Sequence, residues 1–117
     1  MPSPGILSFF VGNKRFGIGI EYFYKITDAD INITSVPGTA DYVEGIINFL
    51  GEIVPVISAS KFFRQDKPAK GREKKMLILQ KDEERIGFLV DGKIDFIEQD
   101  SDMKDIEKVD IALLFER

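Results

Sequence analysis

The stretch that decides the fold runs from Val36 to Ser58 and reads VPGTADYVEGIINFLGEIVPVIS. It opens with a Pro-Gly turn and continues as two runs rich in Ile and Val, Gly45–Leu50 and Ile53–Ile57. Runs of this kind, bounded by glycines, are typical of buried paired strands. The dipeptide Leu50-Gly51 between them predicts a hairpin, although leucine fits the first position of a type I′ turn poorly. Pro55 cannot donate to a sheet, so it indicates an edge strand or a bulge.

Shorter apolar runs on both sides of this hairpin predict further strands, and little of the chain has a helical period. The expected strands are Ile6–Val11, Arg15–Ile20, Met76–Leu79, Ile86–Val90, Ile94–Ile97 and a final strand Val109–Phe115. Two short helical segments are expected, over Glu21–Ile26 and Ala59–Arg64, the second capped by Ser58 or Ser60. Seven or eight short strands with little helix predict an all-β barrel architecture with minor α content.

Composition limits the function. The chain has 117 residues, 44% of them hydrophobic, which is enough for one domain with a core. It contains no Cys and no His, so thiol and imidazole chemistry and the usual metal ligands are absent. We therefore expect no enzyme, and we assign no catalytic, cofactor or metal residues. No apolar run approaches the roughly 20 residues of a membrane span, and a cytoplasmic protein without membrane insertion is the default expectation.

Charge is concentrated in one segment. Residues 61–75 hold seven basic residues against two acidic ones, while the chain as a whole carries a net charge of −4. A run of this kind is usually a solvated loop, and Gln65–Glu73 shows no apolar period. It could also steer an acidic protein partner, with Lys61, Arg64 and Lys67 as the electrostatic contacts. A small nucleic-acid-binding barrel is a further alternative, but no aromatic residues are interleaved through the loop.

Two glycines in the second expected strand, Gly17 and Gly19, leave one face of that strand nearly bare of side chains. We interpret them as sites of close packing. The pair is only a fragment of a dinucleotide-binding fingerprint, because no third glycine or long helix follows.

Three motifs together resemble the CheW-like coupling-protein family of bacterial chemotaxis. The first is the Val36-Pro-Gly turn followed by VEGIIN from Val43, and the second is GEIVPVI from Gly51. The third is RIGFLVD from Arg85, with IDFIE from Ile94 behind it. The resemblance covers about residues 6–98.

This resemblance implies a single domain over residues 1–117, built of two small SH3-like β-barrels that share an apolar core. The early barrel would come mainly from about residues 15–60. The late barrel would come mainly from about residues 75–117 together with the N-terminal strand. The chain looks short at its C-terminal end, because one strand stands where the family usually has two. The late barrel is therefore expected to be truncated, with an open edge that invites pairing.

The resemblance also implies a non-catalytic scaffold that joins the cytoplasmic tip of a chemoreceptor to a CheA-type histidine kinase. The family's receptor contact lies at an Asn-Leu-Arg-Gly turn, and here Leu50 stands where the family has Arg. Leucine lacks the bidentate donor of arginine, so an apolar contact would replace a polar one. The residues assigned to this contact are Val36, Asn48, Phe49, Leu50, Gly51 and Glu52.

The exposed hairpin leaves alternatives open. Phe49 could point into the core while Leu50 is an ordinary exposed leucine, or both could dock a partner helix. The chain could also be a divergent module that binds a single partner, or itself through the C-terminal strand.

Overall fold

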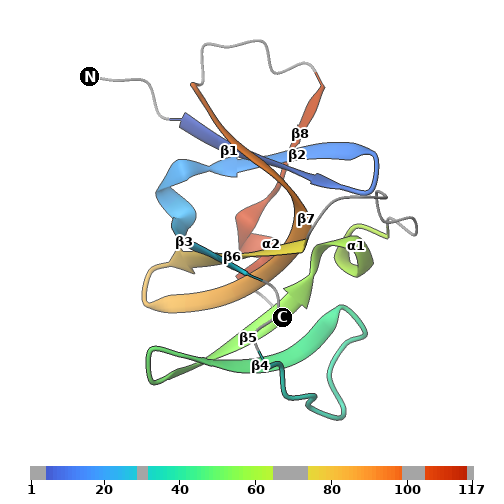
Figure 1. Cartoon of the computed structure of the whole chain (residues 1–117), viewed down its shortest axis with the longest axis vertical. Coiled ribbons are helices and arrows are strands. Elements are labelled where there is room, and N and C mark those ends of the chain that lie inside the picture. The colour runs from blue at the N-terminus through green and yellow to red at the C-terminus, as the bar shows by residue number, and fades with distance from the viewer. Residues whose placement is uncertain (1–4, 29–31, 65–73, 99–104, 116–117) are drawn as a thin grey trace.

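The computed structural model describes residues 5–28, 32–64, 74–98 and 105–115 (Figure 1). Most of them lie in strands, which confirms the all-β prediction with minor helix. The basic loop Gln65–Glu73, including Lys67, lies outside the described residues. The elements are β1 (Gly5–Val11), β2 (Lys14–Gly19), η1 (Ile20–Tyr22), β3 (Phe23–Asp28), β4 (Val43–Phe49), β5 (Glu52–Ser58), α1 (Ala59–Phe62), β6 (Lys74–Lys81), β7 (Glu84–Glu98), β8 (Ile106–Lys108) and α2 (Ile111–Phe115).

Strand β7 connects two groups of strands. Its first half pairs with β6 and with the end of β5, and its second half pairs with β1. One group therefore reads β4-β5-β7-β6-β3 and the other β7-β1-β2-β8. Figure 1 shows β7 curving across the molecule between them. Within the described ranges neither group closes: no pairing joins β3 to β4, and β8 has a neighbour on one side only.

The two groups share their core through strands that are buried on both faces. In β6, Met76 and Ile78 pack into the core of the first group with Ile47, while Leu77 and Leu79 face the larger cluster that contains Phe9. A strand covered on both sides needs an apolar residue at every position. This requirement explains why the sequence shows a continuous apolar run there rather than an alternation.

A buried carboxylate fixes the point where β7 changes partners. Asp91 is 9% exposed and accepts a hydrogen bond of 2.8 Å from the N–H of Gly12 in the β1–β2 turn. The register between β1 and β7 shifts next to it, between Phe9 and Phe10. Asp91 therefore ties the bend of β7 to the neighbouring hairpin, and its role in the RIGFLVD motif is structural.

The hairpin β4–β5 and its flanks form as expected. Val36-Pro-Gly forms a tight turn with Gly38 at a φ of 83°, closed by a 2.9 Å hydrogen bond from Thr39 Oγ1 to the Val36 carbonyl. Pro55 lies opposite Ile46, one residue before β5 begins to pair with β7. Helix α1 starts as predicted, with Ser58 Oγ accepting from the N–H of Lys61.

The helix expected over Glu21–Ile26 is wrong. Only a 3₁₀ turn forms, over Ile20–Tyr22, and the following residues become strand β3. The apolar pattern that suggested the helix spans little more than one turn, and such a short helix is marginal on its own. Pairing with β6, from Phe23 opposite Leu79 to Asp28 opposite Lys75, satisfies the backbone instead.

The final strand expected over Val109–Phe115 is also wrong. The strand is β8, which lies earlier at Ile106–Lys108 and runs parallel to β2, and the chain then forms helix α2. Asp110 Oδ1 accepts from the N–H of Ala112 at 3.1 Å, as a residue at a helix start does. Ile111 and Leu114 share one face and are buried, so the apolar run has helical rather than strand spacing.

Among the described residues, no helix is long and apolar enough to cross a membrane. Within the same residues, no group of three or more acidic side chains is placed to hold a metal ion.

Candidate docking surface at the hairpin turn

Leu50 occupies the end of the β4–β5 hairpin in an unfavourable conformation. Its φ is 52° and that of Gly51 is 84°, the pattern of a type I′ turn. The poor fit that the sequence predicts for leucine is thus a real strain, because residues with a Cβ disfavour positive φ. The side chain is also 78% exposed. The turn is held by Asn48, whose Oδ1 accepts a 2.9 Å hydrogen bond from the N–H of Gly51.

Phe49 points inward. It is 8% exposed and belongs to the core cluster of the first strand group. Its ring meets the Tyr24 ring edge to face, with 6.2 Å between centroids, and the Lys25 ammonium lies 5.9 Å from its centroid. Phe49 therefore packs in the core beneath the turn and is not part of the exposed surface. The apolar surface exposed at the end of the hairpin comes from Leu50 and from Ile53, which is 61% exposed.

Glu52 joins the turn to three other strands through Arg85. The Glu52 carboxylate forms an ion pair with the guanidinium of Arg85, at the start of β7. That guanidinium lies 4.3 Å from the centroid of the Tyr24 ring, and its Nε donates a 3.0 Å hydrogen bond to Gln80 Oε1. These contacts bring β3, β5, β6 and β7 together beside the turn, although β3 and β4 share no backbone pairing in the described part of the chain.

Sequence reasoning missed Tyr24 and Arg85. Tyr24 sits at a β-bulge, where the register between β3 and β6 shifts between Phe23 and Lys25. A bulge re-aims the side chain that it carries, and here Tyr24 turns toward Phe49. The residues come from strands far apart in sequence, so no local spacing could have grouped them.

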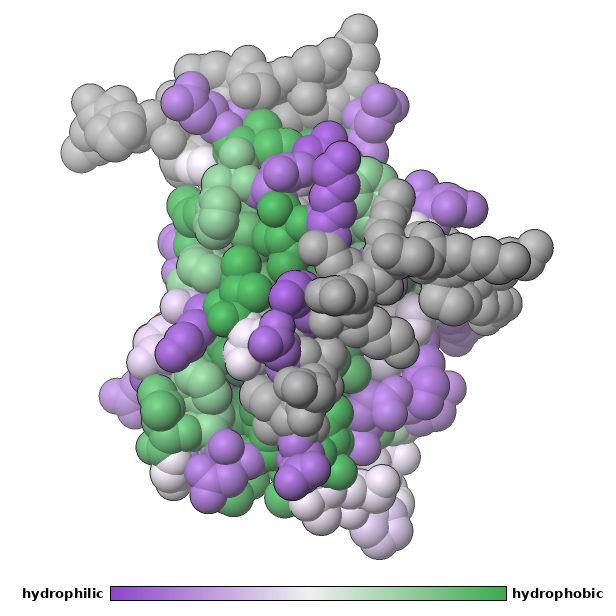
Figure 2. Space-filling view, viewed as in Figure 1, coloured by the Kyte–Doolittle hydropathy of each residue, from purple (hydrophilic) through white to green (hydrophobic). Residues whose placement is uncertain are grey.

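A second apolar area lies along β3. Phe23 and Phe96 meet edge to face with 5.5 Å between their ring centroids, and Phe96 is 57% exposed. In the space-filling view, apolar surface lies over the β1–β3 side and again at the lower left, where Figure 1 places the β4–β5 turn (Figure 2).

Val36 lies apart from the turn. It lines an apolar groove of about 270 Å³ with Tyr42, Ile46 and Pro55. Ile46 is four residues from Leu50 along β4, which corresponds to about 13 Å of extended strand. The structure therefore brings five of the six assigned residues together at the turn and places Val36 at the other end of the hairpin.

Two of the three residues assigned to the electrostatic contact, Lys61 and Arg64, are described and lie near this groove. Lys61 pairs with Glu44 at 3.0 Å, and with Arg64 and Tyr42 it lines a neighbouring hollow.

On β3, Asp28 accepts a 2.8 Å hydrogen bond from Lys75, and this bond together with the lysine's positive charge holds the pKa of the Asp28 carboxyl below its usual value.

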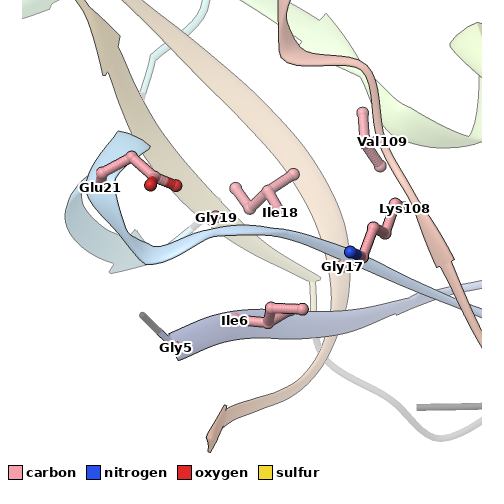
Figure 3. Close-up of a pocket in the computed structure, with 8 residues that line it drawn as sticks. All are labelled: Gly5, Ile6, Gly17, Ile18, Gly19, Glu21, Lys108 and Val109. Atoms are coloured by element: carbon pink, nitrogen blue, oxygen red, sulfur yellow. The ribbon is translucent and has the colours of Figure 1, made fainter. Parts of the chain in front are cut away.

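Figure 3 shows a groove lined by both polar and apolar residues on the second strand group, where β8 leaves the edge of β2. The Glu21 carboxylate points into it from one side and the Lys108 ammonium from the other. Glycines make this packing feasible: a Cβ on Gly17 would lie 2.7 Å from Ile6, and one on Gly19 would overlap the Glu21 carboxylate. The expectation of close packing at Gly17 and Gly19 is confirmed.

The fold defines a small β-sheet domain whose two strand groups share one long strand. The CheW-like domain family model matches residues 5–112, and the chain belongs to that family. This result confirms the resemblance seen in the sequence. None of the comparisons supports the nucleic-acid alternative.

Individual relatives agree with this assignment. The chain is 30% identical over 91 residues to the chemotaxis protein CheW of Klebsiella aerogenes, covering 78% of this chain and 54% of that protein. It is 27% identical over 85 residues to the chemotaxis protein CheW of Helicobacter pylori, covering 73% and 51%. The chain thus spans about half the length of the curated relatives it matches. The crystal structure of scaffolding protein TtCheW from Thermoanaerobacter tengcongensis superposes with a TM-score of 0.72 at 30% identity, covering 86% of this chain and 69% of that one.

Proposed function

We propose that this chain is a non-catalytic scaffold of chemotaxis-type signalling that couples a chemoreceptor to a CheA-type histidine kinase. Its membership of the CheW-like family supports this proposal, as do relatives named as chemotaxis and scaffolding proteins. The proposed site of action is the cytoplasm, where the cytoplasmic tip of a receptor would be reached. This chain spans about half the length of those relatives, so the function is transferred to it here as a proposal.

The observation that carries the proposal is the strained and exposed leucine at the hairpin turn. Leu50 combines a φ of 52° with 78% exposure, and a contact with another molecule would make use of both. An apolar side chain that projects from a rigid turn can pack between the apolar side chains on the surface of a partner helix. Asn48, Phe49, Gly51 and Glu52 hold the turn in that geometry, so we assign the receptor contact to this surface.

A scaffold of this kind needs a second surface for the kinase. The apolar groove beside Val36 lies at the far end of the same hairpin, and Lys61 and Arg64 line the neighbouring hollow. An apolar groove suits the apolar face of a partner domain, and the charges beside it, Lys61 and Arg64 with Asp41, suit a rim that carries both signs of charge. We assign the kinase contact to this face.

Self-association through β8 is the second candidate, because β8 is an edge strand with one free side in the described chain. Symmetric antiparallel pairing of two copies requires one residue to face its own copy, because opposite residues share a face of the sheet. Centring on Glu107 or Lys108 opposes like charges, and centring on Ile106 opposes Asp105 to Glu107. Charge therefore disfavours every central register, and we favour the scaffold.

A calorimetric titration with a purified chemoreceptor cytoplasmic fragment tests the receptor contact. We expect Leu50→Asp to weaken binding by at least about tenfold, because an apolar anchor is replaced by a charge. Leu113→Asp is the matched control, since Leu113 is 55% exposed on α2 and should bind as the wild type does. Equal affinity of the two variants would refute the assignment.

A further inference from the structure

Arg85 is the best-anchored cation at the docking surface. Its Nε donates to Gln80, its Nη1 pairs with Glu52, and its planar face lies over the Tyr24 ring. An arginine held on three sides has already lost most of its side-chain freedom, so a further contact costs little additional entropy. The guanidinium is therefore preorganised beside the turn.

The same guanidinium keeps donors to spare. Arginine carries five N–H groups, and the hydrogen bonds described for Arg85 use Nε and Nη1 but not Nη2. Its side chain remains 27% exposed, so the unused donors can reach solvent or a partner. Leu50 lies two residues from Glu52, which places this polar group next to the exposed apolar anchor.

Two cations lie beside the turn, Arg85 and Lys25. Glu52 balances Arg85, while Lys25 adds a second positive charge above the Phe49 ring. A carboxylate brought to the turn would meet a fixed guanidinium with donors to spare, the pairing that gives strong charge-assisted hydrogen bonds.

We propose that Arg85 is a specificity-determining contact of this surface and receives a carboxylate from the partner helix whose apolar side chain docks on Leu50. The proposal rests on the proposed function and deepens it: the partner segment carries an acidic residue beside its apolar stripe. Glu52 then acts as an internal stand-in for that carboxylate, holding the guanidinium in place until the partner competes for it.

The test compares Arg85→Gln with Glu52→Gln in titrations against the chemoreceptor cytoplasmic fragment at low and high salt. Arg85→Gln should weaken binding by at least about tenfold and flatten its salt dependence, because a charge-assisted contact is lost. Glu52→Gln should weaken binding less than Arg85→Gln does and keep a salt dependence at least as steep as that of the wild type, because the guanidinium that meets the partner carboxylate remains. If both variants weaken binding equally, Arg85 only positions the turn. Unchanged binding by Arg85→Gln also overturns the proposal.

Two further measurements keep the result unambiguous. Arg85→Lys keeps the charge but loses the planar fork, so it should lose part of the affinity with a smaller fall in melting temperature than Arg85→Gln shows. In a second experiment, the acidic residues of the receptor fragment are replaced one at a time by the corresponding amides. One replacement should weaken binding to the wild-type chain but not to Arg85→Gln. The lack of such a position contradicts the proposal. Leu50→Asp separates the two claims: normal binding by this variant refutes the proposed function, whereas its loss alongside normal Arg85→Gln binding refutes only the carboxylate contact.

Discussion

Leu50 combines two features that each cost free energy in a folded protein. A positive φ strains any residue with a Cβ, and a side chain that is 78% exposed contributes little burial. An Asn-Gly turn would adopt the same backbone more readily. Nothing in the described structure packs on Leu50 to offset these costs. We therefore infer that the leucine side chain contributes to a contact with another molecule.

This interpretation predicts opposite effects on stability and binding. Leu50→Asn should raise the free energy of unfolding by about 1 kcal/mol, because asparagine tolerates the left-handed conformation. The same change should weaken binding to the chemoreceptor fragment, because the apolar anchor is gone. Urea denaturation and calorimetry on the same preparations measure both quantities. A variant that is less stable than the wild type yet binds normally would contradict this account.

The sequence alone predicts the hairpin turn but not the side chains that surround it. The spacing of Asn48, Leu50 and Gly51 marks a hairpin that departs from its family, and that signal is local. Tyr24 and Arg85 reach the turn only because β3 and β7 fold beside it, and the β3 bulge that turns Tyr24 leaves no mark in composition or period. Long-range side-chain clusters of this kind follow from the three-dimensional arrangement of strands rather than from spacing.

At the scale of elements, β7 is the strand that unites the molecule. It pairs with β5, β6 and β1, and the change of partners occurs at Asp91. The hydrogen bond from Gly12 to the Asp91 carboxylate holds the β1–β2 turn against this bend. The apolar runs predicted both halves of β7, but not that they form one continuous strand of 15 residues.

Removing the Asp91 carboxylate should destabilise the fold. Asp91→Ala leaves the buried N–H of Gly12 without an acceptor, which should lower the free energy of unfolding by about 1–3 kcal/mol. Asp95→Ala is the control on the same strand, because the Asp95 side chain makes only a half-exposed contact with Arg15 at 3.7 Å and its loss should change stability by less than about 0.5 kcal/mol. Chemical denaturation compares the two. Similar losses for both variants would show that Asp91 has no special role at the bend.

The two mispredicted elements have a common physical cause. In Glu21–Ile26 and in Val109–Phe115 the apolar pattern spans about five to seven residues, too short to separate a helical from a strand period. Pairing with β6 decides the first case in favour of strand. The Asp110 cap and the buried face of Ile111 and Leu114 decide the second in favour of helix. The runs of the β4–β5 hairpin are no longer than these, but the glycines that bound them and the Leu50-Gly51 turn between them mark them as paired strands.

At the scale of the whole molecule, the proposed contacts lie at the two ends of one hairpin. The turn at Leu50 and the groove beside Val36 are joined by β4 and β5, which pack on a common core. A rigid element between two docking surfaces fixes how their partners are oriented. A coupling free energy of about 1–3 kcal/mol between such sites is enough to matter for signalling.

The most direct test of the scaffold function is assembly of all three proteins, followed by sedimentation velocity with the chemoreceptor cytoplasmic fragment and the regulatory domain of a CheA-type kinase. The wild-type chain should form a complex that contains both partners. Leu50→Asp should lose the receptor fragment and keep the kinase domain, because only one surface is changed. Mutually exclusive binding of the two partners, or an intact three-component complex with Leu50→Asp, would contradict the account.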